Sequence, residues 1–114
     1  MIYFACKSIN KEDLIRCSFA LNKTEYKLLM FLLDYDEFIT AAKLAKKMGL
    51  ERTTVQKAVK LLVEKGLVSR KQENLEKGSY IFLYRIKDVK EIKERLRKIV
   101  RKWHEKVEDF IDGL

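Results

Sequence analysis

Proline is absent from the 114 residues of this sequence, and histidine occurs once, as His104. With one histidine and no paired Cys or His spacing, the sequence has no pattern for a metal site, and we expect neither a metal nor a cofactor. No nucleophile, base and orienting group occur together at a readable spacing, so an enzyme is not expected. No apolar run approaches the roughly 20 residues of a membrane-spanning helix, and the apolar start is too short for a signal peptide. These absences favour a cytoplasmic, non-enzymatic protein.

Acidic residues are also scarce relative to basic ones: the chain has 25 Lys and Arg against 17 Asp and Glu, a formal net charge of +8. Residues 40–71 contain nine Lys or Arg and two Glu, so this stretch alone carries +7. A chain of this length forms one domain with a modest core. Positive charge concentrated in one segment is typical of proteins that bind a polyanion, and double-stranded DNA is the partner we expect.

The same basic segment has the spacing of two helices joined by a tight turn. Ala45 is small enough for a close helix crossing, Gly49 can take the left-handed conformation that ends the first helix, and Val55 opens the buried face of the second. We expect the second helix over about 51–65, with Val59 and Leu62 also facing the core. Its opposite face carries hydroxyl, amide and cationic groups suited to phosphates and base edges: Arg52, Thr53, Thr54, Gln56, Lys57 and Lys60.

A hairpin is expected directly after this helix, over about 67–86. Gly66 ends the helix, residues 67–72 and 79–86 are predicted strands, and the polar residues 73–78 form the turn. Tyr80, Phe82 and Tyr84 share one face of the second strand. That face could stack on unpaired bases, but we expect it to be core, because each strand must pack on the helices.

The segments before the basic region have helix-start signals. Residues 1–9 fit either an extended arm or the start of a helix. Asn10 is a predicted cap of a short helix, and Asn22 with Glu25 forms a capping signal that opens the first core helix. We therefore divide the single domain into an arm with a short helix (1–21), a helix-turn-helix with its hairpin (22–86) and a final helix (87–114).

The final segment is a long helix with an apolar stripe at steps of three and four residues. The stripe follows a heptad repeat with one stutter after Trp103. It is longer than a domain of this size can cover, so we expect a two-fold homodimer with a coiled-coil seam. The predicted seam comprises Ile92, Leu96, Ile99, Trp103, Val107 and Phe110. The basic cluster from Arg95 to Lys102 fits a second phosphate contact and a charged coiled-coil flank equally well.

The two cysteines, Cys6 and Cys17, favour two buried thiols in a reducing compartment over a redox pair. The alternative is a thiol-responsive regulator, in which Arg16 next to Cys17 would favour the reactive thiolate.

The string TTVQKAVKLLVEKGLVSR and the Tyr-rich strand after it resemble the winged helix-turn-helix transcription regulators of archaea and bacteria, in the TrmB-like and MarR-like groups. This resemblance covers roughly residues 22–86 and implies a mainly α fold with a small β-wing and a long C-terminal dimerisation helix. It implies that the second motif helix enters the major groove and that the wing lies along the backbone. By position, Thr53, Thr54, Gln56, Lys57 and Lys60 would meet the groove, and phosphates would be met by Arg70, Lys71 and Lys77, with Lys43 and Arg52 nearby.

The sequence departs from that family pattern at Glu51, where a Ser or Asp usually caps the recognition helix. A glutamate suits the helix dipole but repels a phosphate. A winged helix can also serve as a protein-docking or RNA-binding module, so both remain alternatives to a DNA-binding regulator.

Overall fold

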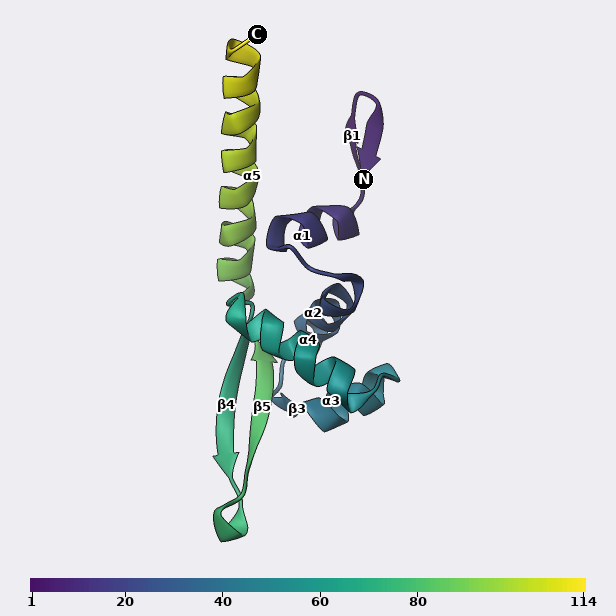
Figure 1. The fold of residues 1–114 in the computed structure, drawn as a ribbon, viewed down its shortest axis with the longest axis vertical. Coiled ribbons are helices and arrows are strands. Elements are labelled where there is room, and N and C mark those ends of the chain that lie inside the picture. Colours follow the sequence, from purple (N-terminus) through teal and green to yellow (C-terminus); the bar gives the residue numbers. More distant parts are fainter. The chain divides into compact units, whose positions relative to one another are not determined.

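The computed structural model describes all 114 residues as two compact units, residues 22–87 and residues 1–21 with 88–114 (Figure 1). The fold is mainly helical with small antiparallel sheets, as the sequence predicts. None of its helices is both long enough and apolar enough to cross a membrane.

The first two of the three helices of the unit 22–87 begin at side-chain caps. The Asn22 side chain accepts a hydrogen bond from the Glu25 backbone at 2.8 Å, and the Glu25 carboxylate accepts one from the Asn22 backbone at 3.2 Å, which confirms the predicted capping box. Thr40 caps the second helix through the Lys43 backbone at 3.2 Å. The helices are α2 (Lys23–Asp34), α3 (Ala41–Met48) and α4 (Arg52–Glu64).

These helices share a core with a three-stranded antiparallel sheet of order β3-β5-β4. The strands are β3 (Ile39–Thr40), β4 (Val68–Asn74) and β5 (Tyr80–Ile86). β4 and β5 form the predicted wing, which extends beyond the helices of its own unit (Figure 1). Val68 pairs with Ile86 at its buried base and Asn74 with Tyr80 near its exposed tip, where residues Glu76–Gly78 form a short 3-10 turn. The predicted hairpin is confirmed, with β4 running two residues further than expected.

One carboxylate is buried in this unit. Glu25 is 3% exposed, and its Oε1, which accepts the capping hydrogen bond, also lies 3.5 Å from Nζ of Lys65. Lys65 is the C-terminal cap residue of α4. A buried carboxylate is tolerated only when its charge is paired and its oxygens are hydrogen-bonded. Glu25 therefore joins the start of α2 to the end of α4.

Replacing Glu25 should lower the free energy of unfolding more than replacing any exposed partner of an ion pair. We expect Glu25→Ala to cost about 2 to 3 kcal/mol, because it removes the cap and leaves the Lys65 ammonium without this carboxylate. Glu25→Gln keeps an acceptor for the cap and should cost less. Glu12→Ala, which breaks the exposed Arg16–Glu12 pair, is the matched control and should cost less than about 1 kcal/mol. Equal losses for Glu25→Ala and Glu12→Ala in urea titrations would contradict the role given to Glu25.

The second unit contains a hairpin, a short helix and a long helix. Residues 1–9, for which the sequence left two possibilities open, pair as β1 (Ile2–Phe4) and β2 (Lys7–Ile9). α1 (Lys11–Phe19) starts at the predicted Asn10 cap, closed by Asp13. α5 (Val89–Asp112) forms the predicted final helix, and α1 packs against it, with the Arg95 guanidinium 5.3 Å from the Phe19 ring centre.

Candidate nucleic-acid interface

The turn between α3 and α4 has the geometry that the sequence predicts for a helix-turn-helix. Gly49 caps α3 in the left-handed conformation, with φ at +67°, and its N–H donates to the Ala45 carbonyl. The Leu50 N–H also donates to that carbonyl, at 3.0 Å. A Cβ at Gly49 would meet no atom within 4 Å, so this position requires glycine for its backbone conformation and not for space. Ala45 is 4% exposed, which is consistent with the close approach of α3 and α4.

α4 has one buried face and one polar face. Val55, Val59 and Leu62 are fully buried, which confirms the predicted inner face. The polar face is exposed along the helix and presents guanidinium, ammonium, hydroxyl and amide groups. It comprises Arg52, Thr53, Thr54, Gln56, Lys57 and Lys60.

The cations of this face are available to an external anion. Lys43 of α3 and Arg52, Lys57 and Lys60 of α4 are exposed, and none belongs to an ion pair. Two other lysines of the basic segment are used within the unit: Lys65 pairs with Glu25, and Lys47 lies 5.6 Å from the Tyr35 ring centre. The exposed cations of the helix-turn-helix that belong to no ion pair and contact no ring therefore lie on both of its helices, with Lys43 and Lys46 on α3 and the others on α4.

The wing divides its basic residues between its two faces. Arg70 and Lys71 are neighbours in β4, so their side chains point to opposite sides of the hairpin. The Arg70 guanidinium lies 4.4 Å from the Phe82 ring centre, and the Lys71 ammonium lies 4.1 Å from that of Phe38. Both side chains are exposed beyond these rings. A single flat surface can contact only one of the two, which the sequence alone does not indicate.

At the wing tip Lys77 is exposed and adopts a left-handed backbone conformation, with φ at +62°. The aromatic face of β5 is only partly core. Tyr84 is 8% exposed, as expected, but Tyr80 is 54% exposed and Phe82 is intermediate. The expectation that all three rings are core is therefore wrong for Tyr80, because β5 continues past the last helix that could cover it. Its ring lies edge-on to Phe82, with centroids 5.4 Å apart.

Comparison with known proteins assigns the chain to a family. Residues 13–107 match the family model for the DnaD N-terminal domain. The chain belongs to the DnaD N-terminal domain family. One relative, an uncharacterised protein of Methanocaldococcus jannaschii, is 30% identical to this chain. The match covers 92% of this chain and 86% of the relative's length.

Solved structures agree on the fold. A protein of Methanosarcina mazei described as a possible transcriptional regulator superposes with a TM-score of 0.93 at 34% identity, covering 99% of this chain and 95% of that one. A protein of Sulfolobus tokodaii gives 0.72 at 26% identity, over 85% and 94% of the two chains. A MarR protein of Peptoclostridium difficile gives 0.54 at 20% identity over 90% and 63%, a likeness of fold alone. The winged-helix fold that the resemblance implies is confirmed, whereas membership of the MarR-like or TrmB-like group stays a prediction.

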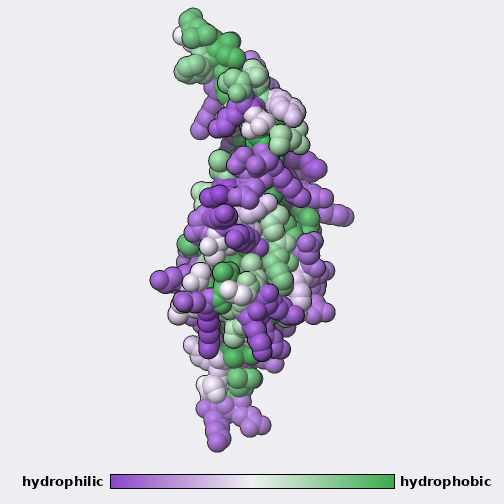
Figure 2. Space-filling view, turned by 90° about the vertical axis from the view of Figure 1, so that its right-hand side faces the viewer, coloured by the Kyte–Doolittle hydropathy of each residue, from purple (hydrophilic) through white to green (hydrophobic).

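The apolar stripe of α5 becomes more exposed toward the C-terminus. Ile92 is 8% exposed, Trp103 56% and Phe110 75%, whereas Leu96, Ile99 and Val107 are intermediate. Ile92, a predicted seam residue, is therefore covered within the single chain. A second apolar surface of the same unit is formed by the hairpin residues Met1–Phe4, which were not predicted although the run MIYFAC was a signal for them. Green apolar residues gather at the C-terminal end of α5 in Figure 2, and the wing tip is purple.

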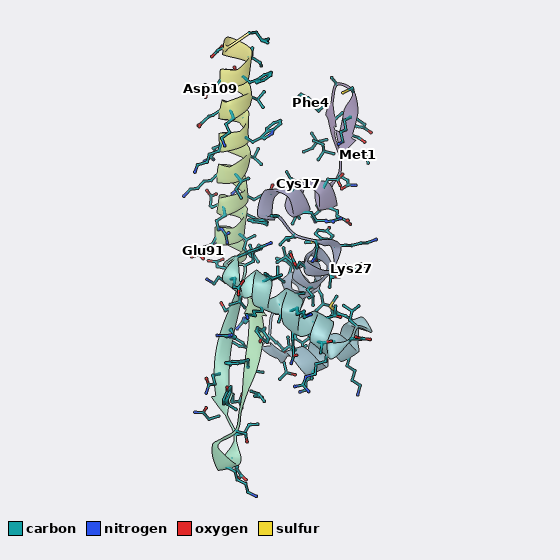
Figure 3. The ribbon with its side chains drawn as sticks, viewed as in Figure 1. Met1, Phe4, Cys17, Lys27, Glu91 and Asp109 are labelled. Atoms are coloured by element: carbon teal, nitrogen blue, oxygen red, sulfur yellow. The ribbon has the colours of Figure 1, made fainter.

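Both cysteines are exposed and unpaired, so the expectation of two buried thiols is wrong. Cys6 lies in the turn of the β1–β2 hairpin, which leaves its side chain in solvent, and Cys17 lies on α1 (Figure 3). Arg16 binds the Glu12 carboxylate at 3.2 Å and donates to the Leu21 carbonyl at 3.3 Å, so its guanidinium is engaged elsewhere. This leaves the proposed activation of Cys17 without support from Arg16.

α4 starts without a side-chain cap. Glu51 occupies the N-cap position of α4 in an extended conformation, and its side chain makes no capping hydrogen bond. A glutamate is one methylene too long for the geometry in which aspartate accepts a bond from the second or third helical N–H. The departure at Glu51 noted in the sequence thus corresponds to an uncapped helix end.

Replacing Glu51 with the shorter aspartate should stabilise the folded protein. We expect Glu51→Asp to raise the free energy of unfolding by about 0.5 to 1 kcal/mol, because it supplies a cap without changing the charge. Glu51→Ala is the control, since it shortens the side chain without providing an acceptor, and should give no gain. Urea titrations of the three proteins measure the effect. No difference between the aspartate and alanine variants would show that the position does not act as a cap.

Proposed function

We propose that this protein is a sequence-specific regulator of transcription that binds double-stranded DNA as a homodimer. In this proposal α4 enters the major groove and the β4–β5 wing follows the phosphate backbone. The observation that carries the proposal is the two-sided character of α4, whose inner residues are fully buried and whose outer side presents exposed polar and basic groups from Arg52 to Lys60. An α-helix fits the major groove, where such groups can reach base edges.

The chemistry of each side chain indicates which part of the DNA it can contact. Gln56 can form a bidentate pair with adenine, and the hydroxyls of Thr53 and Thr54 can bind base edges or phosphates near the start of the helix. Lys57 and Lys60 lie one turn apart on the exposed side of α4, a spacing suited to phosphates flanking the groove. Lys43, Arg70, Lys71 and Lys77 supply the surrounding positive charge. The relative from Methanosarcina mazei, described as a possible transcriptional regulator, supports the same assignment.

The homodimer is proposed from the apolar stripe of α5. Trp103 and Phe110 are more than half exposed in the single chain, and Val107 between them is partly exposed. Large apolar side chains aligned along one side of a helix form a typical contact surface for a second helix. Two recognition helices related by a two-fold axis would read a pseudo-palindromic site.

Removing a lysine from the outer face of α4 should weaken DNA binding in a salt-dependent way. If Lys57 contacts one phosphate, Lys57→Ala should reduce the slope of log K against log salt concentration by about 0.9. The same change is expected for Lys60→Ala. Fluorescence anisotropy with a duplex selected from random sequences, at several salt concentrations, measures the slope.

Lys27→Ala is the matched control for this experiment, because Lys27 is exposed on α2, outside the helix-turn-helix (Figure 3). It should leave the slope unchanged. If the Lys57 and Lys60 variants behave like the Lys27 variant, the contact surface lies elsewhere on the protein.

A charge placed in the stripe of α5 should separate the proposed dimer. Trp103→Glu should shift the protein to monomer in sedimentation at micromolar concentrations, because two rings per dimer lose their apolar partner and two carboxylates would be buried. His104→Glu changes the neighbouring exposed residue, which lies off the stripe, and should remain dimeric. A dimer that survives Trp103→Glu would place the interface outside this stripe.

A further inference from the structure

The charges on α5 are separated along its length. Residues 89–102 contain seven Lys or Arg and two Glu, a net charge of +5, whereas residues 103–114 contain one Lys and four Asp or Glu, a net charge of −3 with His104 neutral. The stability of an isolated helix favours the reverse arrangement, since its dipole is best matched by acidic residues at the N-terminus and basic residues at the C-terminus. The last turn of α5 contains acidic Asp109 and Asp112 and no basic residue. Helix stability alone therefore does not account for this distribution.

The spacing of the apolar stripe on α5 is symmetric about Trp103. Ile99 and Val107 lie four residues on either side, and Leu96 and Phe110 lie seven residues on either side. The stutter after Trp103 interrupts the heptad repeat and gives a second step of four residues, from Trp103 to Val107. This step matches the one from Ile99 to Trp103 and so makes the spacing symmetric. A helix with such a stripe presents the same sequence of apolar steps in both directions.

We propose that the dimer forms by antiparallel pairing of α5 with α5 of a second copy, centred on Trp103. The proposal rests on the homodimer proposed above and adds its orientation and register. Trp103 then meets Trp103 of the partner subunit, while Leu96 lies level with the partner's Phe110 and Ile99 with the partner's Val107. Each basic half lies along an acidic half, so opposite charges are brought together along the helix pair.

A parallel pair would have the opposite electrostatic effect. It would bring the two +5 halves together and the two −3 halves together, and like charges on neighbouring helices are destabilising. It would also align the two helix dipoles, which an antiparallel pair sets in opposition. The apolar contacts are similar in both orientations, so charge decides between them.

The orientation determines where the two winged units are attached. At 1.5 Å per residue, antiparallel pairing about Trp103 places the two Val89 residues about 42 Å apart along the axis, whereas parallel pairing places them side by side. Lys87, the last residue of the winged unit, is separated from Val89 by Asp88 alone. An antiparallel dimer therefore carries its two winged units at opposite ends of the helix pair.

Disulfide trapping of the full-length protein distinguishes the orientations. In a background with Cys6→Ser and Cys17→Ser, single variants Leu96→Cys, Trp103→Cys and Phe110→Cys are oxidised and run on non-reducing gels. We expect Trp103→Cys to give covalent dimer, because this position meets itself. Phe110→Cys alone should give none, since the two thiols are about 21 Å apart along the axis. A mixture of Leu96→Cys and Phe110→Cys chains should give covalent heterodimer.

The outcomes separate this inference from the proposed function. Covalent dimer from Leu96→Cys alone and from Phe110→Cys alone, with none specific to the mixture, means parallel pairing and overturns the inference while the dimer stands. If sedimentation of the reduced proteins, including the Cys6→Ser and Cys17→Ser background, shows only monomer, the homodimer itself fails.

A spin label at exposed Lys90 provides a second measurement that leaves the stripe intact. Antiparallel pairing places the two labels about 40 Å or more apart, and parallel pairing less than about 30 Å, given helix axes about 10 Å apart. A distance distribution below about 30 Å would overturn the inference even if the cysteine variants of the stripe failed to fold.

Discussion

The buried carboxylate of Glu25 is the interaction on which the geometry of the winged unit depends. One oxygen accepts the backbone N–H that starts α2 and also faces the ammonium of Lys65 at the end of α4. A charge at 3% exposure loses nearly all of its hydration, so it is stable only while both groups remain in place. The pair therefore specifies where α4 ends relative to α2, in addition to the non-directional packing of the core.

This interaction also affects how charge is distributed over the unit. The basic segment holds nine Lys and Arg, and those near the core and the sheet are engaged by a carboxylate or by aromatic rings. The remaining cations are exposed on the two helices of the helix-turn-helix, α3 and α4. Net charge alone would describe a generally basic protein, whereas the folded unit shows which of its cations are exposed. The DNA-binding proposal rests on these exposed cations more than on the total charge.

The unit of residues 1–21 and 88–114 contains most of the exposed large apolar side chains of the protein. Its long helix exposes large apolar side chains along a stripe whose spacing is symmetric about Trp103, and its charges change sign near the same residue. The hairpin of residues Ile2–Ile9 has only two short strands, and a hairpin of this size is marginal without further packing. Both features fit the proposed homodimer, while the winged unit closes its own core.

The sequence by itself determined the local structure with good accuracy. Asn10, Asn22, Thr40 and Gly49 begin or end helices where capping chemistry predicts, and the inner face of α4 follows from helical periodicity. These features depend on neighbours within a few residues, so the sequence contains all the information that they need.

Tertiary structure decided what depends on distant contacts. The Glu25–Lys65 pair joins residues forty positions apart, and no local pattern indicates it. The exposure of Tyr80, Cys6 and Cys17 depends on which elements end before reaching them. The separation of Arg70 from Lys71 and the pairing of residues 1–9 depend on strand partners. Burial and pairing are properties of the whole arrangement in space, whereas caps and periodicity are properties of a short stretch of chain.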